Sequence, residues 1–97
     1  MPYIKQDRRE LFNDSIHNIS NKFKSESWEG DLNYCINILV QNILKDYGTN
    51  YSNLNAAIGA LECAKLEIYR RICSPYEDVK IQENGDTSYS HTQHINN

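Results

Sequence analysis

The sequence predicts an all-α protein: a small three-helix domain followed by an extended or hairpin C-terminal arm. Its longest stretches carry apolar residues at three- and four-residue intervals, the spacing that puts them on one face of a helix. A glycine or a proline follows the two longest of these stretches, where a helix is expected to stop. A chain of 97 residues has room for one domain with a small core.

The first helix is expected to start at Asp14 or Ser15, after a short extended arm over residues 1–5 and a turn capped by Asp7. Its polar positions are poor helix formers, so this helix needs tertiary contacts to be stable. One side carries Phe12, Ile16, Ile19 and Phe23.

The second helix is expected to begin at a capping Asp31 and to end before Gly48, a typical C-terminal glycine. Residues 24–30 form the preceding loop, in which Trp28 is interpreted as a lid over the edge of the core. The apolar face of this helix consists of Leu32, Ile36, Leu39, Ile43 and Tyr47. The short connection 49–51 then predicts that the next helix is its antiparallel neighbour.

The central helix is expected over residues 52–74, capped by Ser52 and stopped by Pro75. Its far side carries small residues where a solvent-exposed helix normally has charged ones. These small residues include Ala56, Ala60 and Cys63. A second copy of the chain is therefore expected to cover this side, which predicts a homo-oligomer.

Lys65 lies in the middle of the apolar face of the central helix. One interpretation is that its side chain reaches solvent and pairs with Glu62, one turn earlier. The other is that Lys65 and Glu62 form a polar site inside an interface, because a buried ammonium needs a carboxylate partner.

After Pro75 the pattern changes to alternation, and Asn84-Gly85 is typical of a two-residue hairpin turn. Residues 79–89 are therefore expected to form a short hairpin or an extended arm, and residues 91–97 a disordered tail. This gives a helical domain over 1–74, an arm over 75–90 and a tail over 91–97.

The formal net charge is −3 and the pI about 5.5, so the chain has no basic field for nucleic acid. No apolar run approaches the length of a membrane span. The three cysteines, Cys35, Cys63 and Cys73, are interpreted as free thiols in a reducing compartment. A cytoplasmic protein is expected.

The sequence carries no phosphate loop, no HExxH, no CxxC and no nucleophile elbow. His91 and His94 lie in the predicted tail without an evident third metal ligand. Glu62 and Glu67 are five residues apart and face different ways, unlike the acidic arrays that hold magnesium. We therefore expect a protein that is not an enzyme and needs no cofactor or metal.

The best candidate binding site is a group of aromatic and basic residues around the end of the central helix. Arginine can grip a phosphate with two hydrogen bonds, and tyrosine can stack on a base. The alternative is that the arginines only neutralise the helix end and pair with nearby carboxylates. The group comprises Tyr69, Arg70, Arg71, Tyr76 and Lys80, with Lys65 and Glu62 as further candidate ligand-binding residues.

Three tracts, MPYIKQDRRELF, GDLNYCI and above all ALECAKLEIYRRICSPYEDVKIQENGD, resemble a family of short uncharacterised bacteriophage and bacterial proteins. The resemblance covers most of residues 1–86 and departs after Asp86. It transfers no activity, but it implies that ten residues between 69 and 85 form one unit. They are Tyr69, Arg70, Arg71, Pro75, Tyr76, Glu77, Asp78, Lys80, Asn84 and Gly85.

Two function classes follow. The first is a small oligomeric phage-type protein that sequesters a nucleotide-like anionic ligand of host defence signalling, with the site at a subunit boundary. The second is a helical interaction module that inhibits or adapts a host protein through Tyr3, Trp28 and residues 76–89.

Overall fold

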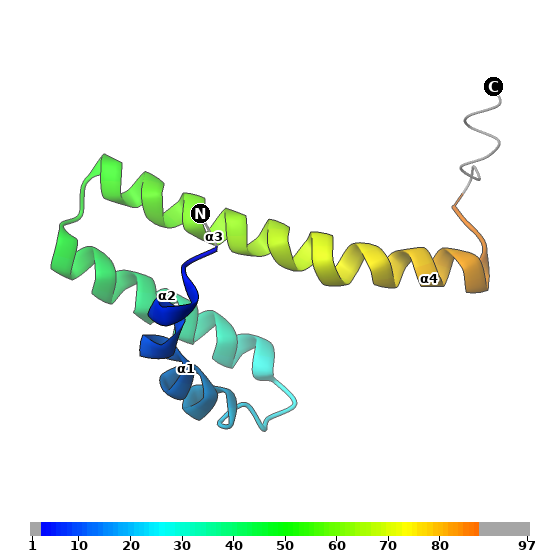
Figure 1. The fold of residues 1–97 in the computed structure, drawn as a ribbon, viewed down its shortest axis with the longest axis horizontal. Coiled ribbons are helices and arrows are strands. Elements are labelled where there is room, and N and C mark those ends of the chain that lie inside the picture. The colour runs from blue at the N-terminus through cyan, green and yellow to red at the C-terminus, as the bar shows by residue number, and fades with distance from the viewer. Residues whose placement is uncertain (1–2, 88–97) are drawn as a thin grey trace. The chain divides into compact units, whose positions relative to one another are not determined.

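The computed structural model describes residues 3–87 (Figure 1). Its elements are α1 (Gln6–Ser20), α2 (Trp28–Tyr47), α3 (Tyr51–Ile68), the π-helical turn η1 (Tyr69–Cys73) and α4 (Ser74–Asn84). No strand occurs among the described residues, so the all-α prediction is confirmed. The chain divides into two compact units, residues 1–61 and 62–97, and the division falls inside α3.

Helix α1 is one unbroken helix and starts earlier than the sequence predicted. The Lys5 carbonyl accepts hydrogen bonds from the backbone N–H groups of Arg8 and Arg9, at 3.1 and 3.2 Å. The predicted start at Asp14 or Ser15 is therefore wrong, because both residues lie inside the helix. The residues after Asp7 are good helix formers, which explains why the turn there continues as a helix.

Helix α2 starts at Trp28, not at the predicted Asp31, so the connection from α1 covers only residues 21–27. Glu29 and Asp31 then lie in the first turn, where the helix dipole favours negative charge. The predicted end at Gly48 is confirmed. Its φ of +107° is a backbone conformation that favours glycine, and its N–H donates to the Leu44 carbonyl at 2.7 Å.

Helix α3 is capped by Asn50, whereas the sequence predicted Ser52. The Asn50 side-chain oxygen accepts the backbone N–H of Asn53 at 2.9 Å, and the Asn50 carbonyl accepts that of Leu54 at 2.9 Å. Asparagine caps a helix as well as serine does, so Asn50 can take the capping role that the sequence assigned to Ser52. Figure 1 shows α2 and the first part of α3 running in opposite directions, as expected.

Pro75 does not stop the helix, which corrects the prediction of a helix end at residue 74. Helix α3 passes into η1, where the Ser74 N–H donates to the Tyr69 carbonyl five residues earlier. In a regular α-helix, Pro75 would leave one carbonyl without a donor, and its ring would clash with that carbonyl. The wider π-helical turn before Pro75 accommodates both effects, so the helix continues. Arg70 and Arg71 therefore lie within a continuous helical segment and not at its end.

The hairpin or extended arm predicted over 79–89 is wrong for its described part, because residues 74–84 form α4. Gly85 ends this helix with φ +84° and donates its N–H to the Ile81 carbonyl at 2.8 Å. Asn-Gly fits a helix end as well as a hairpin turn, and the alternation of Val79 and Ile81 with Lys80 and Gln82 is too short to decide between them.

Residues 88–97 lie outside the described residues, and with them the predicted tail and its two histidines, His91 and His94. The division into segments 1–74, 75–90 and 91–97 stays a prediction. None of the described residues is buried in the single chain. A single chain in this form therefore has no enclosed hydrophobic core among residues 3–87.

Candidate functional site

The predicted ligand-binding residues all lie on the helical segment formed by the end of α3, η1 and α4. Lys65 and Lys80 are fifteen residues apart on this segment. At the helical rise this is about 22 Å along the axis. The structure therefore spreads these residues along a rod instead of gathering them around one point.

The basic side chains nearest the predicted site pair with carboxylates on the same segment. Lys65 Nζ lies 3.1 Å from Glu62 Oε1, and both side chains are exposed. The Arg70 guanidinium contacts Glu67 at 3.1 Å, and Arg71 Nε contacts the same carboxylate. For Lys65 this geometry matches the interpretation in which its side chain reaches solvent and pairs with Glu62.

The remaining residues of the predicted site, Tyr69, Tyr76 and Lys80, also have neighbours on the same segment. Lys80 Nζ lies 5.5 Å from the centre of the Tyr76 ring and 3.1 Å from Glu83 Oε2. A hydrogen bond to Glu77, and secondarily the charge of that carboxylate, raise the pKa of Tyr69 above 10.0. The Tyr69 hydroxyl is thus a donor to Glu77, on the far side of the π-helical turn.

These contacts give the segment an acidic balance. Residues 62–87 contain four Lys or Arg and six Asp or Glu, a formal charge of −2. The named pairs are surface ion pairs, each worth at most about 1 kcal/mol, so an anion could displace a carboxylate from an arginine. It would first have to compete with that carboxylate.

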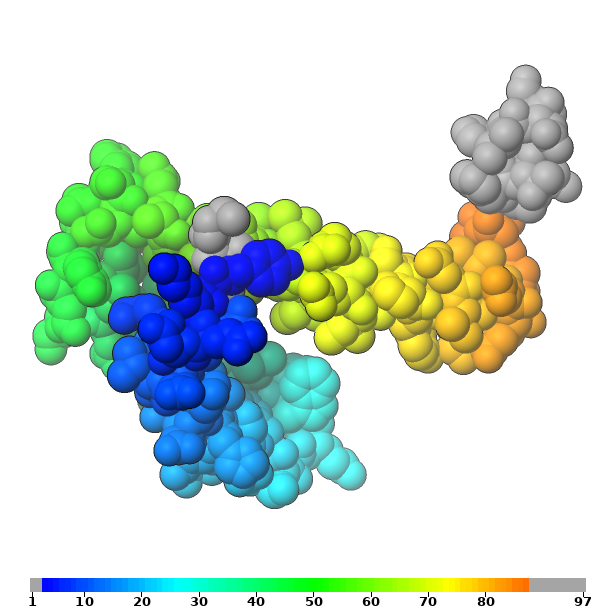
Figure 2. Space-filling model, in the orientation of Figure 1, coloured from blue at the N-terminus to red at the C-terminus, as the bar shows by residue number. Residues whose placement is uncertain are grey.

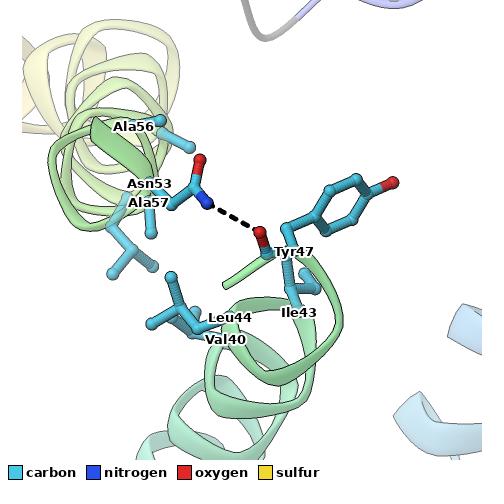
Figure 3. A pocket seen from close by; sticks show the side chains of 9 residues that line it. Val40, Ile43, Leu44, Tyr47, Asn53, Ala56 and Ala57 are labelled. Carbon is cyan, nitrogen blue, oxygen red and sulfur yellow. Dashed lines mark hydrogen bonds between the residues drawn. The ribbon is translucent and has the colours of Figure 1, made fainter. Parts of the chain in front are cut away.

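A different surface is formed by α2 and the first part of α3, within residues 1–61. Between the two helices lies an open groove of about 420 Å³, which we call the hairpin groove. In Figure 3, Val40 and Leu44 extend from α2 toward Ala57 of α3, and the Tyr47 ring points away. The groove is lined by Val40, Ile43, Leu44, Tyr47, Asn53, Ala56, Ala57, Ala60 and Leu61.

Asn53 holds the closed end of the hairpin groove. Its side-chain amide donates to the carbonyl oxygen of Tyr47 at 3.0 Å (Figure 3) and to that of Gly48 at 2.9 Å. These carbonyls belong to the end of α2, where the helix leaves acceptors without an internal donor. Asn53 carries the only side-chain amide among the lining residues, and this amide joins α2 to α3. None of the lining residues carries a charge.

Helix α2 also exposes an apolar stripe, Leu32, Ile36, Leu39 and Ile43, which we call the α2 stripe. Leu39 is 58% exposed and Ile43 46% exposed. No residue from 32 to 44 is charged, so every face of the helix over this range is uncharged. The polar side chains in this range, Asn33, Asn37, Gln41 and Asn42, are uncharged as well.

Both surfaces of unit 1–61 also stand out in the sequence by their lack of charge. Residues 47–61, like residues 32–44, contain no Asp, Glu, Lys or Arg. The pattern of small residues predicts an interface on the central helix. Of these, Ala56 and Ala60 line the hairpin groove and are exposed in the single chain, as is Cys63.

A family model described as a domain of unknown function, DUF6899, matches residues 1–87. The chain belongs to the DUF6899 family. The match covers all of the described helices of this DUF6899 chain. No curated protein and no solved structure was found to match it. Among the described helices of the DUF6899 chain, none has the length and apolar character needed to cross a membrane.

Proposed function

We propose that this chain is a non-enzymatic helical module that acts by binding another protein through the hairpin groove. The observation that carries the proposal is the absence of any buried residue between 3 and 87, combined with two long uncharged segments. The resemblance to bacteriophage and bacterial proteins makes a protein of the host cell the class of partner we propose.

The exposed apolar surface is large on the scale of protein stability. Full burial of one Leu or Ile side chain is worth about 1.5–3 kcal/mol. The four residues of the α2 stripe are each close to half exposed. Covering this stripe alone would therefore contribute roughly 3–6 kcal/mol of hydrophobic free energy. This is comparable to the total stability of a small domain.

The groove favours an apolar helix over a charged ligand. Its α3 side consists largely of the small residues Ala56, Ala57 and Ala60, which let another helix approach closely. Its α2 side supplies the larger side chains Val40 and Leu44 (Figure 3). An amphipathic helix that lays its apolar face in such a groove is a common mode of recognition. A nucleotide would find no cation there.

The test introduces charge into the groove without disturbing the helix. Ala56→Glu with Ala60→Glu keeps good helix formers at exposed positions but charges the groove wall. Asn55→Glu on the same helix is the matched control, because residue 55 is rotated by 100° or more from every lining residue on α3. All variants are first compared with wild type for helicity by circular dichroism.

Each variant then serves as bait in extract from the host cell. Wild type and Asn55→Glu should retain a stoichiometric partner. The double variant should retain at least about tenfold less of this partner than wild type does. Reconstitution from purified components then checks that the partner binds directly. Equal retention by all three baits would overturn the assignment of the groove.

Sequestration of a nucleotide-like anion at residues 69–80 is a second candidate. It is favoured by the closeness of two guanidinium groups: Arg70 and Arg71 both reach Glu67, so an anion that displaced this carboxylate would meet two cations. We expect no cyclic or linear nucleotide to raise the Tm. A nucleotide that raises the Tm of wild type but not of Arg70→Ala with Arg71→Ala would establish this second function instead.

A further inference from the structure

Helices α1 and α2 carry apolar stripes with the same spacing. On α1 and the turn after it the stripe is Phe12, Ile16, Ile19 and Phe23, and on α2 it is Leu32, Ile36, Leu39 and Ile43. Both follow intervals of four, three and four residues, the pattern of a seam between two supercoiled helices. The α2 stripe spans about 16 Å along its helix, and the helical part of the α1 stripe, Phe12 to Ile19, spans about 10 Å, with Phe23 beyond the end of α1.

Within one chain the two stripes meet only at one end. Ile19, Phe23 and Cys35 line one shallow depression, and Phe23, Trp28 and Leu32 line another. Figure 2 shows the end of α1 and the first residues of α2 in contact, in light blue and cyan. The other ends stay open: on α1, Phe12 is 44% and Ile16 56% exposed, and on α2, Leu39 is 58% and Ile43 46% exposed.

The connection between α1 and α2 is folded by local hydrogen bonds. Backbone N–H groups of Lys22, Phe23 and Lys24 donate to carbonyls two or three residues earlier, at 3.0 to 3.3 Å. The Ser27 N–H donates to Ser25 Oγ at 3.1 Å, and the Ser27 carbonyl accepts the Gly30 N–H at 3.2 Å. In Figure 1, α1 and α2 are not parallel.

Charge decides which helix fits the α2 stripe. In the antiparallel register that sets Phe23 against Leu32 and Phe12 against Ile43, position 9 falls opposite position 46, so Arg9 meets Asp46. Two α2 stripes paired with each other would instead set Glu29 against Asp46 at both ends. Like charges opposite one another disfavour that arrangement, whereas Arg9 and Asp46 attract.

We propose that the DUF6899 chain forms a two-fold dimer by exchange of α1: the α1 stripe of one copy lies antiparallel on the α2 stripe of the other, and reciprocally. In this dimer Ile16 meets Leu39 of the partner subunit, and Arg9 meets the partner's Asp46. Two identical contacts form at once, as two-fold symmetry requires. The inference goes beyond the binding of a host protein, and its test leaves all groove residues unchanged.

The test uses disulfide formation between separately made chains. The three cysteines, Cys35, Cys63 and Cys73, are first replaced by Ala in a background checked for wild-type helicity and mass. One chain carries Ile16→Cys and a second, tagged chain carries Leu39→Cys. After mixing, any disulfide between them is necessarily intermolecular. The control chain carries Gln41→Cys, two residues from Leu39 and on another face of α2.

We expect the pair of Ile16→Cys and Leu39→Cys to cross-link at least about tenfold faster than Ile16→Cys with Gln41→Cys, because only facing side chains reach disulfide distance. Faster cross-linking of Ile36→Cys with Leu39→Cys would show α2 against α2 and overturn the proposal. A chain with both Ile16→Cys and Leu39→Cys that closes only on itself would also overturn it, as would no cross-link above control.

A charge reversal gives an independent readout of the register. Arg9→Glu changes both symmetric ion pairs of the dimer and should weaken dimerisation by up to about thirtyfold, which is about fivefold for each exposed pair, and Asp46→Arg added to it should restore the wild-type dissociation constant. Failure of the second change to restore dimerisation would contradict the pairing of Arg9 with Asp46.

Discussion

Replacement of Leu39 by Glu should lower the free energy of unfolding by about 3 kcal/mol or more, although Leu39 is 58% exposed in the single chain. Glu and Leu have similar helix propensities, so the substitution is nearly neutral for an exposed helix in isolation. A large loss is expected only if the α2 stripe is covered in the working protein. Urea unfolding followed by circular dichroism at fixed protein concentration measures the difference.

Gln41→Glu is the control for this experiment. It adds the same charge to the same uncharged segment of α2, two residues further on and on a different face. Its effect should stay within about 0.5 kcal/mol, as for most exposed substitutions. If Leu39→Glu changes stability no more than Gln41→Glu does, the α2 stripe faces water and the assembly we propose does not form.

Replacement of Asn53 by Ala should cost about 1–3 kcal/mol, because two carbonyl acceptors at the end of α2 lose their donor. The Asn53 amide contacts the Tyr47 and Gly48 carbonyls at 3.0 and 2.9 Å. The Asn53 backbone N–H, which Asn50 caps, is unaffected by the change. Unfolding in urea provides the measurement, and hydrogen exchange of the amides in residues 44–57 should speed up.

Asn55→Ala is the matched control for Asn53→Ala. It is the same substitution one half-turn further along α3, at an exposed position. Alanine is the better helix former, so this variant should be slightly more stable than wild type. Equal effects at the two positions would mean that Asn53 contributes only its helix propensity and does not hold the groove closed.

The helices could be predicted from the sequence because apolar spacing and glycine stops are local signals. Gly48 illustrates this, since the same residue is expected and found at the end of α2. The boundaries at Asp14, Asp31 and Ser52 were wrong for a common reason. Several polar residues near each helix start can cap it, and the choice depends on neighbours that a pattern does not reveal.

The C-terminal segment could not be predicted because two of its signals have two meanings. A proline stops a regular α-helix, but the π-helical turn before Pro75 lets the helix continue. Asn84-Gly85 fits a hairpin turn or a helix end, and the chain uses Gly85 as a helix end. The hairpin interpretation rested on the alternation of Val79 and Ile81, which was too short to decide.

For the candidate site, the sequence indicated residue types but not their pairing. Arg70, Arg71 and Lys80 were chosen as cations near tyrosines, and the structure adds a carboxylate beside each of them, Glu67 or Glu83. The spacing of Glu67 and Arg71 already indicated one such pair. The absence of charge over residues 32–44 was readable in the sequence and lies on the helix where we propose that partners bind.

The most direct test of the central claim, that the apolar surface of residues 1–61 is covered by protein in solution, is the mass of the native chain. Sedimentation equilibrium over a hundredfold range of concentration should give at least twice the chain mass of 11.3 kDa at the upper end. A constant mass of one chain throughout, with the full helical signal retained, would contradict the account.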